Sequence, residues 1–138
     1  MIVADTGAVL ALLDAGDRHH DELRDLFEDD PSAWVLPWAI LPEVDYLTLT
    51  HLGAAVELLL LRDLAQGRFR VEFGDDRDLL RAHEICRQHR ALKLGLVDGV
   101  VMAVAERLGA RAIATLDLRH FGAVALKGRP QLLPRDRS

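Results

Sequence analysis

Two short apolar runs, near opposite ends of the chain, each end on an aspartate. Residues 1–4 lead into Asp5, and residues 112–116 lead into Asp117. Apolar runs of this length, bounded by polar residues, are typical of strands buried in a parallel sheet. Because an open α/β sheet carries its chemistry at the carboxyl ends of the strands, this pattern places two carboxylates in one crevice.

Between these two runs, strand-like segments alternate with segments whose apolar residues recur at helical spacing. We predict further strands at residues 34–36, 69–73 and 131–133. We predict a turn at residues 6–7 and helices at residues 8–13, 19–28, from the segment bracketed by Pro37 and Pro42 to Gly53, at 54–65, from Asp75 or Asp76 to about His89, and at 98–108. This alternation predicts an α/β sandwich with a mostly parallel sheet.

The composition is that of a globular protein. The chain has 138 residues, half of them hydrophobic, so we expect residues 1–138 to form a single domain with a frayed polar tail at about residues 134–138. The single Cys86 excludes an intrachain disulfide and a zinc site built from cysteines. No apolar stretch is long enough to cross a membrane, and no basic segment precedes the first strand, so we expect a cytoplasmic protein without membrane contact.

Several apolar side chains have an expected place. On the helix that ends near His89, the residues expected to face the core are Leu79, Leu80, Ala82, His83 and Cys86. Trp34 and Trp38 flank a predicted strand, and we expect both in the core or in an interface. The four leucines at residues 58–61 cover more than one helical turn, so at least one must be exposed. That helix is therefore a candidate interface with another chain.

Two more acids, Glu43 and Asp98, lie where helices are predicted to begin, and with Asp5 and Asp117 they form a set without an obvious basic partner. Two carboxylates ~6 Å apart repel by roughly 3 kcal/mol at an effective dielectric constant near 20. Mg²⁺ or Mn²⁺, which prefer oxygen ligands, would offset that repulsion. One or two such ions can activate water and stabilise a leaving oxygen, which is the chemistry of phosphodiester hydrolysis.

The same acids also have simpler interpretations. An aspartate at a helix start, such as Asp98, is commonly an N-cap, and Asp5 and Asp117 could each form a turn. The net charge of −5 argues against a general nucleic-acid-binding protein, which is usually basic. If the four acids bind metal, however, most of the negative charge belongs to the site, and nucleic acid can still be held there as a substrate.

At these positions the chain resembles PIN-domain proteins, specifically the VapC-type toxin ribonucleases of toxin–antitoxin pairs. The likeness covers essentially the whole chain and is carried by four segments: IVADT at residues 2–6, PEV and YL within residues 42–47, a helix at residues 96–109 that begins LVDG, and ATLDLRHF at residues 114–121. The last two segments are the specific ones. The resemblance implies a PIN-like α/β/α sandwich, with a mostly parallel sheet of about five strands flanked by helices.

The resemblance also implies a function. It implies a metal-dependent endoribonuclease with Mg²⁺ or Mn²⁺ as the cofactor and RNA as the substrate. It further implies the toxin component of a type II toxin–antitoxin system, with a small VapB-like antitoxin as partner and a tendency to form a homodimer. The implied metal ligands and catalytic residues are Asp5, Glu43, Asp98 and Asp117, with Thr115 and Thr6 as accessory hydroxyls.

Other interpretations remain beside this one. The chain could be a PIN-domain nuclease of RNA processing without a toxin role, or an inactive PIN-like module that only binds a partner, although all four acids are present. A phosphotransfer enzyme of the haloacid-dehalogenase type would need an acid where Gly7 stands. A response-regulator receiver domain would need an acidic pair after the first strand, where the chain has Asp5 and Thr6.

Arg119 and His120 lie close behind the fourth acid. Because an arginine suits phosphate oxygens, Arg119 is a candidate contact to an RNA phosphate, with His120 a weaker one. The alternative is a purely structural turn in which Phe121 is buried.

Overall fold

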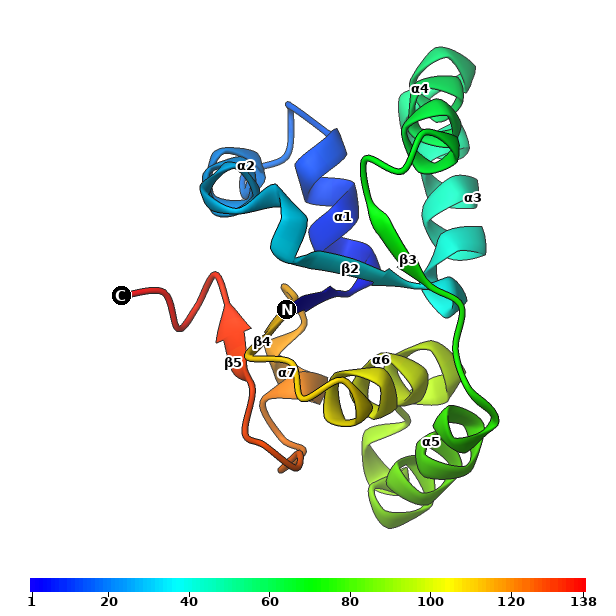
Figure 1. Ribbon diagram of the computed structural model, residues 1–138, viewed down its shortest axis with the longest axis vertical. Helices are drawn as coiled ribbons and strands as arrows, with labels where there is room; N and C mark the ends of the chain where they lie inside the picture. Colours follow the sequence, from blue (N-terminus) through cyan, green and yellow to red (C-terminus); the bar gives the residue numbers. More distant parts are fainter.

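The computed structural model describes all 138 residues, and its centre is one five-stranded parallel sheet. In sheet order the strands are β3 (Arg70–Glu72), β2 (Trp34–Pro37), β1 (Ile2–Ala4), β4 (Ala112–Ala114) and β5 (Gln131–Leu133) (Figure 1). Every neighbouring pair of strands is parallel. The predicted fold class, an α/β sandwich with a parallel sheet of about five strands, is confirmed.

Helices cover both faces of this sheet (Figure 1). The first layer consists of α1 (Thr6–Leu13), α2 (His20–Asp29), α3 (Leu41–Leu52) and α4 (Ala54–Ala65). The second consists of α5 (Asp76–Gln88), α6 (Gly95–Arg107) and the short α7 (Leu118–Phe121). Three-residue 3₁₀ turns lie at Pro31–Ala33, Trp38–Ile40 and Arg90–Leu92. None of the helices has both the length and the apolar composition needed to cross a bilayer.

The strand order explains why the helices form two layers. From β1 the chain steps outward to β2 and β3, and then returns to the other side of β1 to form β4 and β5. Because crossovers between parallel strands are right-handed, reversing the direction of travel moves the later helices to the opposite face. The reversal occurs between β1 and β4, and the crevice at the carboxyl ends of such a pair is where open α/β sheets bind ligands.

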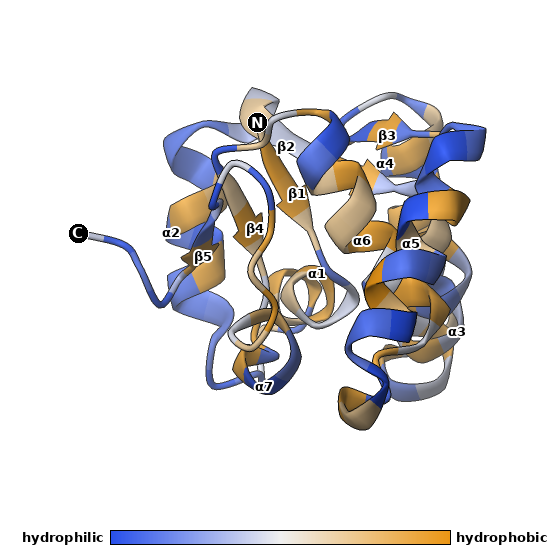
Figure 2. Ribbon diagram, turned by 90° about the horizontal axis from the view of Figure 1, so that it is seen from below, coloured by the Kyte–Doolittle hydropathy of each residue, from blue (hydrophilic) through white to orange (hydrophobic).

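The central strands form the core. All residues of β1, β2 and β4 are buried, and these strands are apolar along their length, as Figure 2 shows for β1 and β4. This is the pattern of a sheet covered on both faces. Trp34 is 1% exposed and has Phe27 edge-on at 5.4 Å between ring centroids, which confirms its expected place in the core.

The expected core face of α5 is wrong in part. Ala82 is buried and Cys86 is half-buried, as predicted, but Leu79 and Leu80 are 60% and 63% exposed and His83 is also exposed. The buried stripe is instead formed by Asp78, Ala82 and Ile85. Asp78 faces inward because it closes a capping box with Asp75 and binds an arginine from α6. These polar contacts set the rotation of the helix and turn both leucines outward.

Two helix starts also differ from the sequence-based expectation. Helix α1 begins at Thr6 with Asp5 as its N-cap, so residues 6–7 lie in the first helical turn and do not form a separate turn. Helix α6 begins at Gly95, three residues before the predicted start at Asp98. The side chain of Asp98 makes no capping bond there, so the capping interpretation of this residue is wrong. Its carboxylate is available for other contacts.

Candidate functional site

The site is built on the two strands at the reversal point of the sheet. Strands β1 and β4 are in register, with Ala4 opposite Ala114. One residue further on, the backbone N–H of Asp5 donates to the carbonyl of Ala114 at 2.9 Å. The ladder thus extends just past β1 and fixes Asp5 beside the chain that leads from β4 to Asp117.

Asp5 is held by two hydrogen bonds in a buried position. Its Oδ1 accepts the backbone N–H of Thr6 at 2.8 Å, which caps α1, and its Oδ2 accepts the hydroxyl of Thr115 at 3.0 Å. Only 6% of Asp5 is exposed. Burial, reinforced by the nearby charges of Asp98 and Asp117, raises the pKa of Asp5 to about 6, although the two hydrogen bonds oppose this shift.

The Thr115 hydroxyl joins the acids of the two strands. It donates to Asp5 and accepts the backbone N–H of Asp117 at 3.0 Å, and the residue is 1% exposed. Asp117 in turn caps α7, since its Oδ1 accepts the backbone N–H of His120 at 3.1 Å. Phe121 is buried, and its ring anchors the short helix, which is compatible both with a structural turn and with a phosphate contact by Arg119.

The third acid, Asp98, reaches the same crevice from α6. Gly99, the next residue, allows α6 to pack closely on α5, because a Cβ there would lie 3.0 Å from the Cys86 Sγ atom. Burial raises the pKa of Asp98, against the opposing hydrogen bond and charge of His120, and the charges of Asp117 and Glu43 add to the increase. The fold therefore brings Asp5, Asp98 and Asp117 into one electrostatic unit.

His120 belongs to this unit, and the sequence did not identify it as such. Its Nδ1 lies 2.6 Å from Oδ2 of Asp98 and 3.2 Å from Oδ2 of Asp117. Ligand atoms of these three residues all lie within 4.8 Å of one another, close enough to share a metal ion. The available sequence indication was the three-residue spacing from Asp117, which a capping turn converts into a side-chain contact.

The remaining predicted site residues lie around this unit. Glu43 is exposed in the first turn of α3, and its charge helps to raise the pKa of Asp98. It is not one of the three residues whose ligand atoms lie within 4.8 Å of one another. The Thr6 hydroxyl is buried and has no hydrogen-bond partner. Arg119 is exposed on α7 and forms no salt bridge. The roles predicted for Glu43, Thr6 and Arg119 remain predictions.

The residues present fit a divalent cation. The crevice offers carboxylate oxygens, hydroxyls and one imidazole, and no arginine or lysine of the chain forms a salt bridge with its aspartates. The hydroxyl of Thr6, the residue after Asp5, is buried without a hydrogen-bond partner. Hard oxygen donors with a single imidazole suit Mg²⁺, Mn²⁺ and related ions.

Comparison with known proteins gives the family. The PIN domain family model matches residues 2–127. The chain belongs to the PIN domain family. Ribonuclease VapC26 of Mycobacterium tuberculosis is 31% identical over 123 residues, which cover 89% of this chain and 91% of that protein.

Solved structures confirm the PIN fold. The crystal structure of Mycobacterium tuberculosis VapC20, described as a toxin that cleaves the sarcin-ricin loop, aligns with a TM-score of 0.78 and 21% identity over 91% of this chain and 97% of that one. DNA-bound VapBC from Salmonella typhimurium aligns with a TM-score of 0.71 and 18% identity over 96% of this chain and 97% of that one. FitAcB from Neisseria gonorrhoeae aligns with a TM-score of 0.66 and 17% identity over 96% of each chain.

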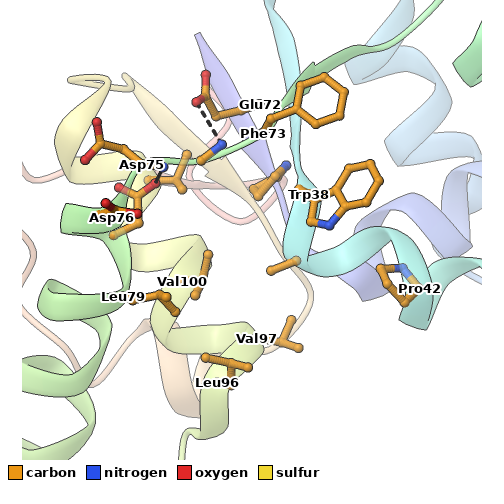
Figure 3. Close-up of a pocket in the computed structure, with 15 residues that line it drawn as sticks. Trp38, Pro42, Glu72, Phe73, Asp75, Asp76, Leu79, Leu96, Val97 and Val100 are labelled. Carbon is orange, nitrogen blue, oxygen red and sulfur yellow. Dashed lines mark hydrogen bonds between the residues drawn. The ribbon is translucent and has the colours of Figure 1, made fainter.

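This PIN domain has an apolar groove of about 480 Å³ beside the acidic crevice. Figure 3 shows Trp38 and Phe73 together on one wall, with Leu79 on α5 and Val100 on α6 opposite. Trp38 is 52% exposed and so lies outside the core, while a place in an interface stays a prediction. Its ring centroid lies 5.1 Å from that of Phe73, which is 72% exposed. Val97 and Pro42, which line the groove, directly precede Asp98 and Glu43 in the sequence, so the groove borders the helices that carry these two acids.

A second apolar surface lies on α4 of the PIN domain. Leu60 points into the core and is 2% exposed, whereas Leu58, Leu59 and Leu61 are 63%, 50% and 43% exposed. The expected exposure within this run of leucines is confirmed. Three exposed leucines on one helix make α4 a candidate for contact with another chain.

Proposed function

We propose that this PIN domain is a metal-dependent endoribonuclease and the toxin of a type II toxin–antitoxin pair. The observation that carries the proposal is the joining of Asp5 and Asp117 through Thr115, at the reversal point of the sheet, with Asp98 facing them from α6. The likeness to Ribonuclease VapC26 and to the VapC and VapBC structures supports both the reaction class and the toxin role.

Each residue has a part in the proposed reaction. Asp5, Asp98 and Asp117 would hold Mg²⁺ or Mn²⁺, and Glu43 would join them from α3. A bound divalent ion lowers the pKa of a water molecule and neutralises charge on the phosphate, which allows hydrolysis near neutral pH. Thr115 fixes the orientation of two of the carboxylates, and the exposed Arg119 lies on α7 where it can hold an RNA phosphate. Thr6 serves as an accessory hydroxyl.

Membership of the PIN family removes the haloacid-dehalogenase and receiver interpretations. An inactive partner-binding module is disfavoured because burial, with nearby negative charges adding to it, raises the pKa of Asp5 and Asp98, a cost that a non-catalytic fold has no reason to keep. A nuclease of RNA processing without a toxin role differs from the proposal only in its partner. The cellular experiment below separates these two.

The proposed partners are a small VapB-like antitoxin and a second copy of the chain. An inhibitor of the acidic crevice should carry an arginine or lysine that pairs with its carboxylates and competes with the ion. The two apolar surfaces, the groove at Trp38 and Phe73 and the leucine face of α4, supply one contact area for each partner. Phe73→Glu and Leu58→Glu change residues that are exposed in the free chain, so both variants should fold.

These two variants assign the surfaces. Size-exclusion chromatography with light scattering reports the oligomeric state, and co-purification with the product of the adjacent gene reports antitoxin binding. We expect one variant to lose self-association and the other to lose the antitoxin. If both variants keep both contacts, these surfaces are not the interfaces.

The toxin role is tested by expressing the chain alone, with the adjacent gene, and as Asp5→Asn. We expect growth arrest with the wild-type chain, rescue by the adjacent gene and no arrest with the variant. In vitro, cleavage of structured RNA should require Mg²⁺ or Mn²⁺ and stop with a chelator. A wild-type chain that cleaves RNA in vitro but is harmless in the cell would leave the nuclease and remove the toxin role.

A further inference from the structure

His120 is the one residue of the crevice that offers a nitrogen. Its ring is held by the α7 turn, which Phe121 anchors in the core and Asp117 caps through the His120 backbone N–H. The side chain is 18% exposed, and its Nδ1 atom points between the carboxylates of Asp98 and Asp117. This is a fixed imidazole that faces the place where the ion is proposed to bind.

We propose that His120 Nδ1 is itself a ligand of the divalent ion, together with Asp98 and Asp117. The inference rests on the proposed metal-dependent function and adds a nitrogen ligand to it. Adjacent donors of an octahedral ion with bonds of ~2.1 Å lie roughly 3 Å apart. The two observed separations from Nδ1, 2.6 Å to Asp98 and 3.2 Å to Asp117, lie on either side of that value.

A different role for His120 would give the opposite result. If the imidazole served only as a hydrogen-bonding partner that satisfies Asp98 when no ion is bound, the ion would have to displace it. Removing the ring would then strengthen ion binding. If the ring is a ligand, removing it weakens binding, so the sign of the change in affinity separates the two roles.

A nitrogen ligand also affects the choice of metal. Imidazole binds first-row transition ions, whereas Mg²⁺ prefers oxygen and gives up its water ligands reluctantly. The site should therefore favour Mn²⁺ over Mg²⁺, and this preference should depend on His120. His120→Ala removes the ligand, while His120→Asn places an oxygen near the position of Nδ1 and keeps the volume of the side chain more nearly constant.

The experiment measures ion binding without RNA. Calorimetric titration with Mn²⁺ and Mg²⁺, and electron paramagnetic resonance of bound Mn²⁺, are applied to the wild type, His120→Ala, His120→Asn and His83→Ala. His83 is exposed on α5 and provides a matched control. Thermal unfolding with a chelator present establishes that each variant is folded.

We expect His120→Ala to weaken Mn²⁺ binding by about 10- to 100-fold, a loss that removing even the supporting partners of metal ligands can cause. Mg²⁺ binding by His120→Ala should fall less, so that the preference of the site for Mn²⁺ over Mg²⁺ becomes smaller. His120→Asn should keep Mg²⁺ binding but should not restore the preference for Mn²⁺. Unchanged or tighter Mn²⁺ binding in His120→Ala would overturn the role of His120 as a ligand but would leave the proposed metal-dependent function standing. A wild type that binds neither ion overturns this inference and the proposed metal-dependent function together.

Discussion

Two acidic clusters of this protein differ in what neutralises them. Between α5, α6 and β3, the chain supplies its own cations. Arg107 binds Asp78 at 2.7 Å and Glu72 at 2.9 Å, and Arg81 binds Glu106 at 2.7 Å. We refer to these five residues as the arginine-paired cluster.

The crevice at the ends of β1 and β4 has acids but no such arginines. Asp5 forms no salt bridge, and the one ion-pair partner of Asp98 and Asp117 is His120. Burial would raise the pKa of Glu106, but hydrogen bonds from Arg81 and from the Lys127 N–H outweigh it and lower that pKa. In the crevice, burial prevails and raises the pKa of Asp5 to about 6.

An acidic site can thereby be distinguished from an acidic part of the scaffold. Where the chain pairs its carboxylates, their charge stabilises the fold and is no longer available to a ligand. Where the chain gathers carboxylates without an arginine or lysine partner, the fold is less stable without a cation, and that lost stability is available as binding energy for one. Activity should therefore depend on the crevice, and stability on the arginine-paired cluster.

The largest expected effect is on catalysis. Asp98→Asn, and likewise the same change at Asp5 or Asp117, should lower RNA cleavage by about 100-fold or more, since each removes a charge needed to hold the ion. Glu43→Gln should behave similarly. Glu72→Gln, in the arginine-paired cluster, is the matched control and should keep near wild-type cleavage per folded molecule. Comparable losses in Glu72→Gln and Asp98→Asn would break the distinction between the clusters.

The second effect is on stability and belongs to the arginine-paired cluster. Arg107→Ala leaves Asp78, which is 5% exposed at its side chain, without its partner. Breaking a buried pair in this way costs about 3–5 kcal/mol in the free energy of unfolding. Urea denaturation should show this loss, with a smaller one in Arg107→Lys, which keeps the charge but not the two-pronged geometry. Cleavage by the folded fraction should persist, and its disappearance would contradict the assignment.

A third prediction uses pH to compare the clusters. The pKa of Asp5 rises from 3.8 to about 6 on folding, so the folded state holds its proton more tightly than the unfolded chain does. Stability from this residue is therefore complete below pH ~4 and is lost as the pH rises through about 6, a cost of about 3 kcal/mol at neutral pH. The lowered pKa of Glu106 acts in the opposite sense and favours folding at higher pH.

Asp5→Asn isolates that cost. With a chelator present, the variant should be more stable than the wild type by up to about 3 kcal/mol at pH 7.5, and the difference should close near pH 4. Mn²⁺ should remove most of the difference at pH 7.5, because it stabilises only the wild-type site. The measurement is chemical denaturation at the two pH values. If the wild type is more stable than Asp5→Asn at pH 7.5 without metal, the charged Asp5 does not destabilise the fold.

How far the sequence predicted these clusters depends on the kind of contact. The strands and the positions of Asp5 and Asp117 could be predicted from short apolar runs. A parallel strand that is buried on both faces has a continuous apolar sequence, and functional residues of such sheets lie at the carboxyl ends of the strands. The rotation of α5 did not follow, since Asp78 and Arg107 set it through a capping box and an ion pair that hydrophobic periodicity does not register. His120 was underrated for the same reason, because its contact with Asp98 depends on the capping turn.

The smallest expected effect concerns Thr115, the hydroxyl that connects Asp5 with Asp117. Thr115→Val keeps the shape but removes a donor to Asp5 and leaves the Asp117 N–H without its acceptor. Losing hydrogen bonds of this kind at a buried position costs about 1–3 kcal/mol, and at neutral pH part of that cost arises because Asp5 loses one of the bonds that favour its charged form. We expect a small change in stability and a reduction in cleavage below that of the aspartate variants.

Thr115→Ser restores the hydroxyl and should recover most of the cleavage, which separates the hydrogen bonds from the packing of the methyl group. The pH profile adds a readout that packing alone would not change: without the Thr115 donor, the pKa of Asp5 should rise further, and the acidic limb of the cleavage profile should move to higher pH in Thr115→Val. If Thr115→Val shifts neither the profile nor the rate, each carboxylate is positioned by its own cap, and the Thr115 bridge between the strands is dispensable to the site.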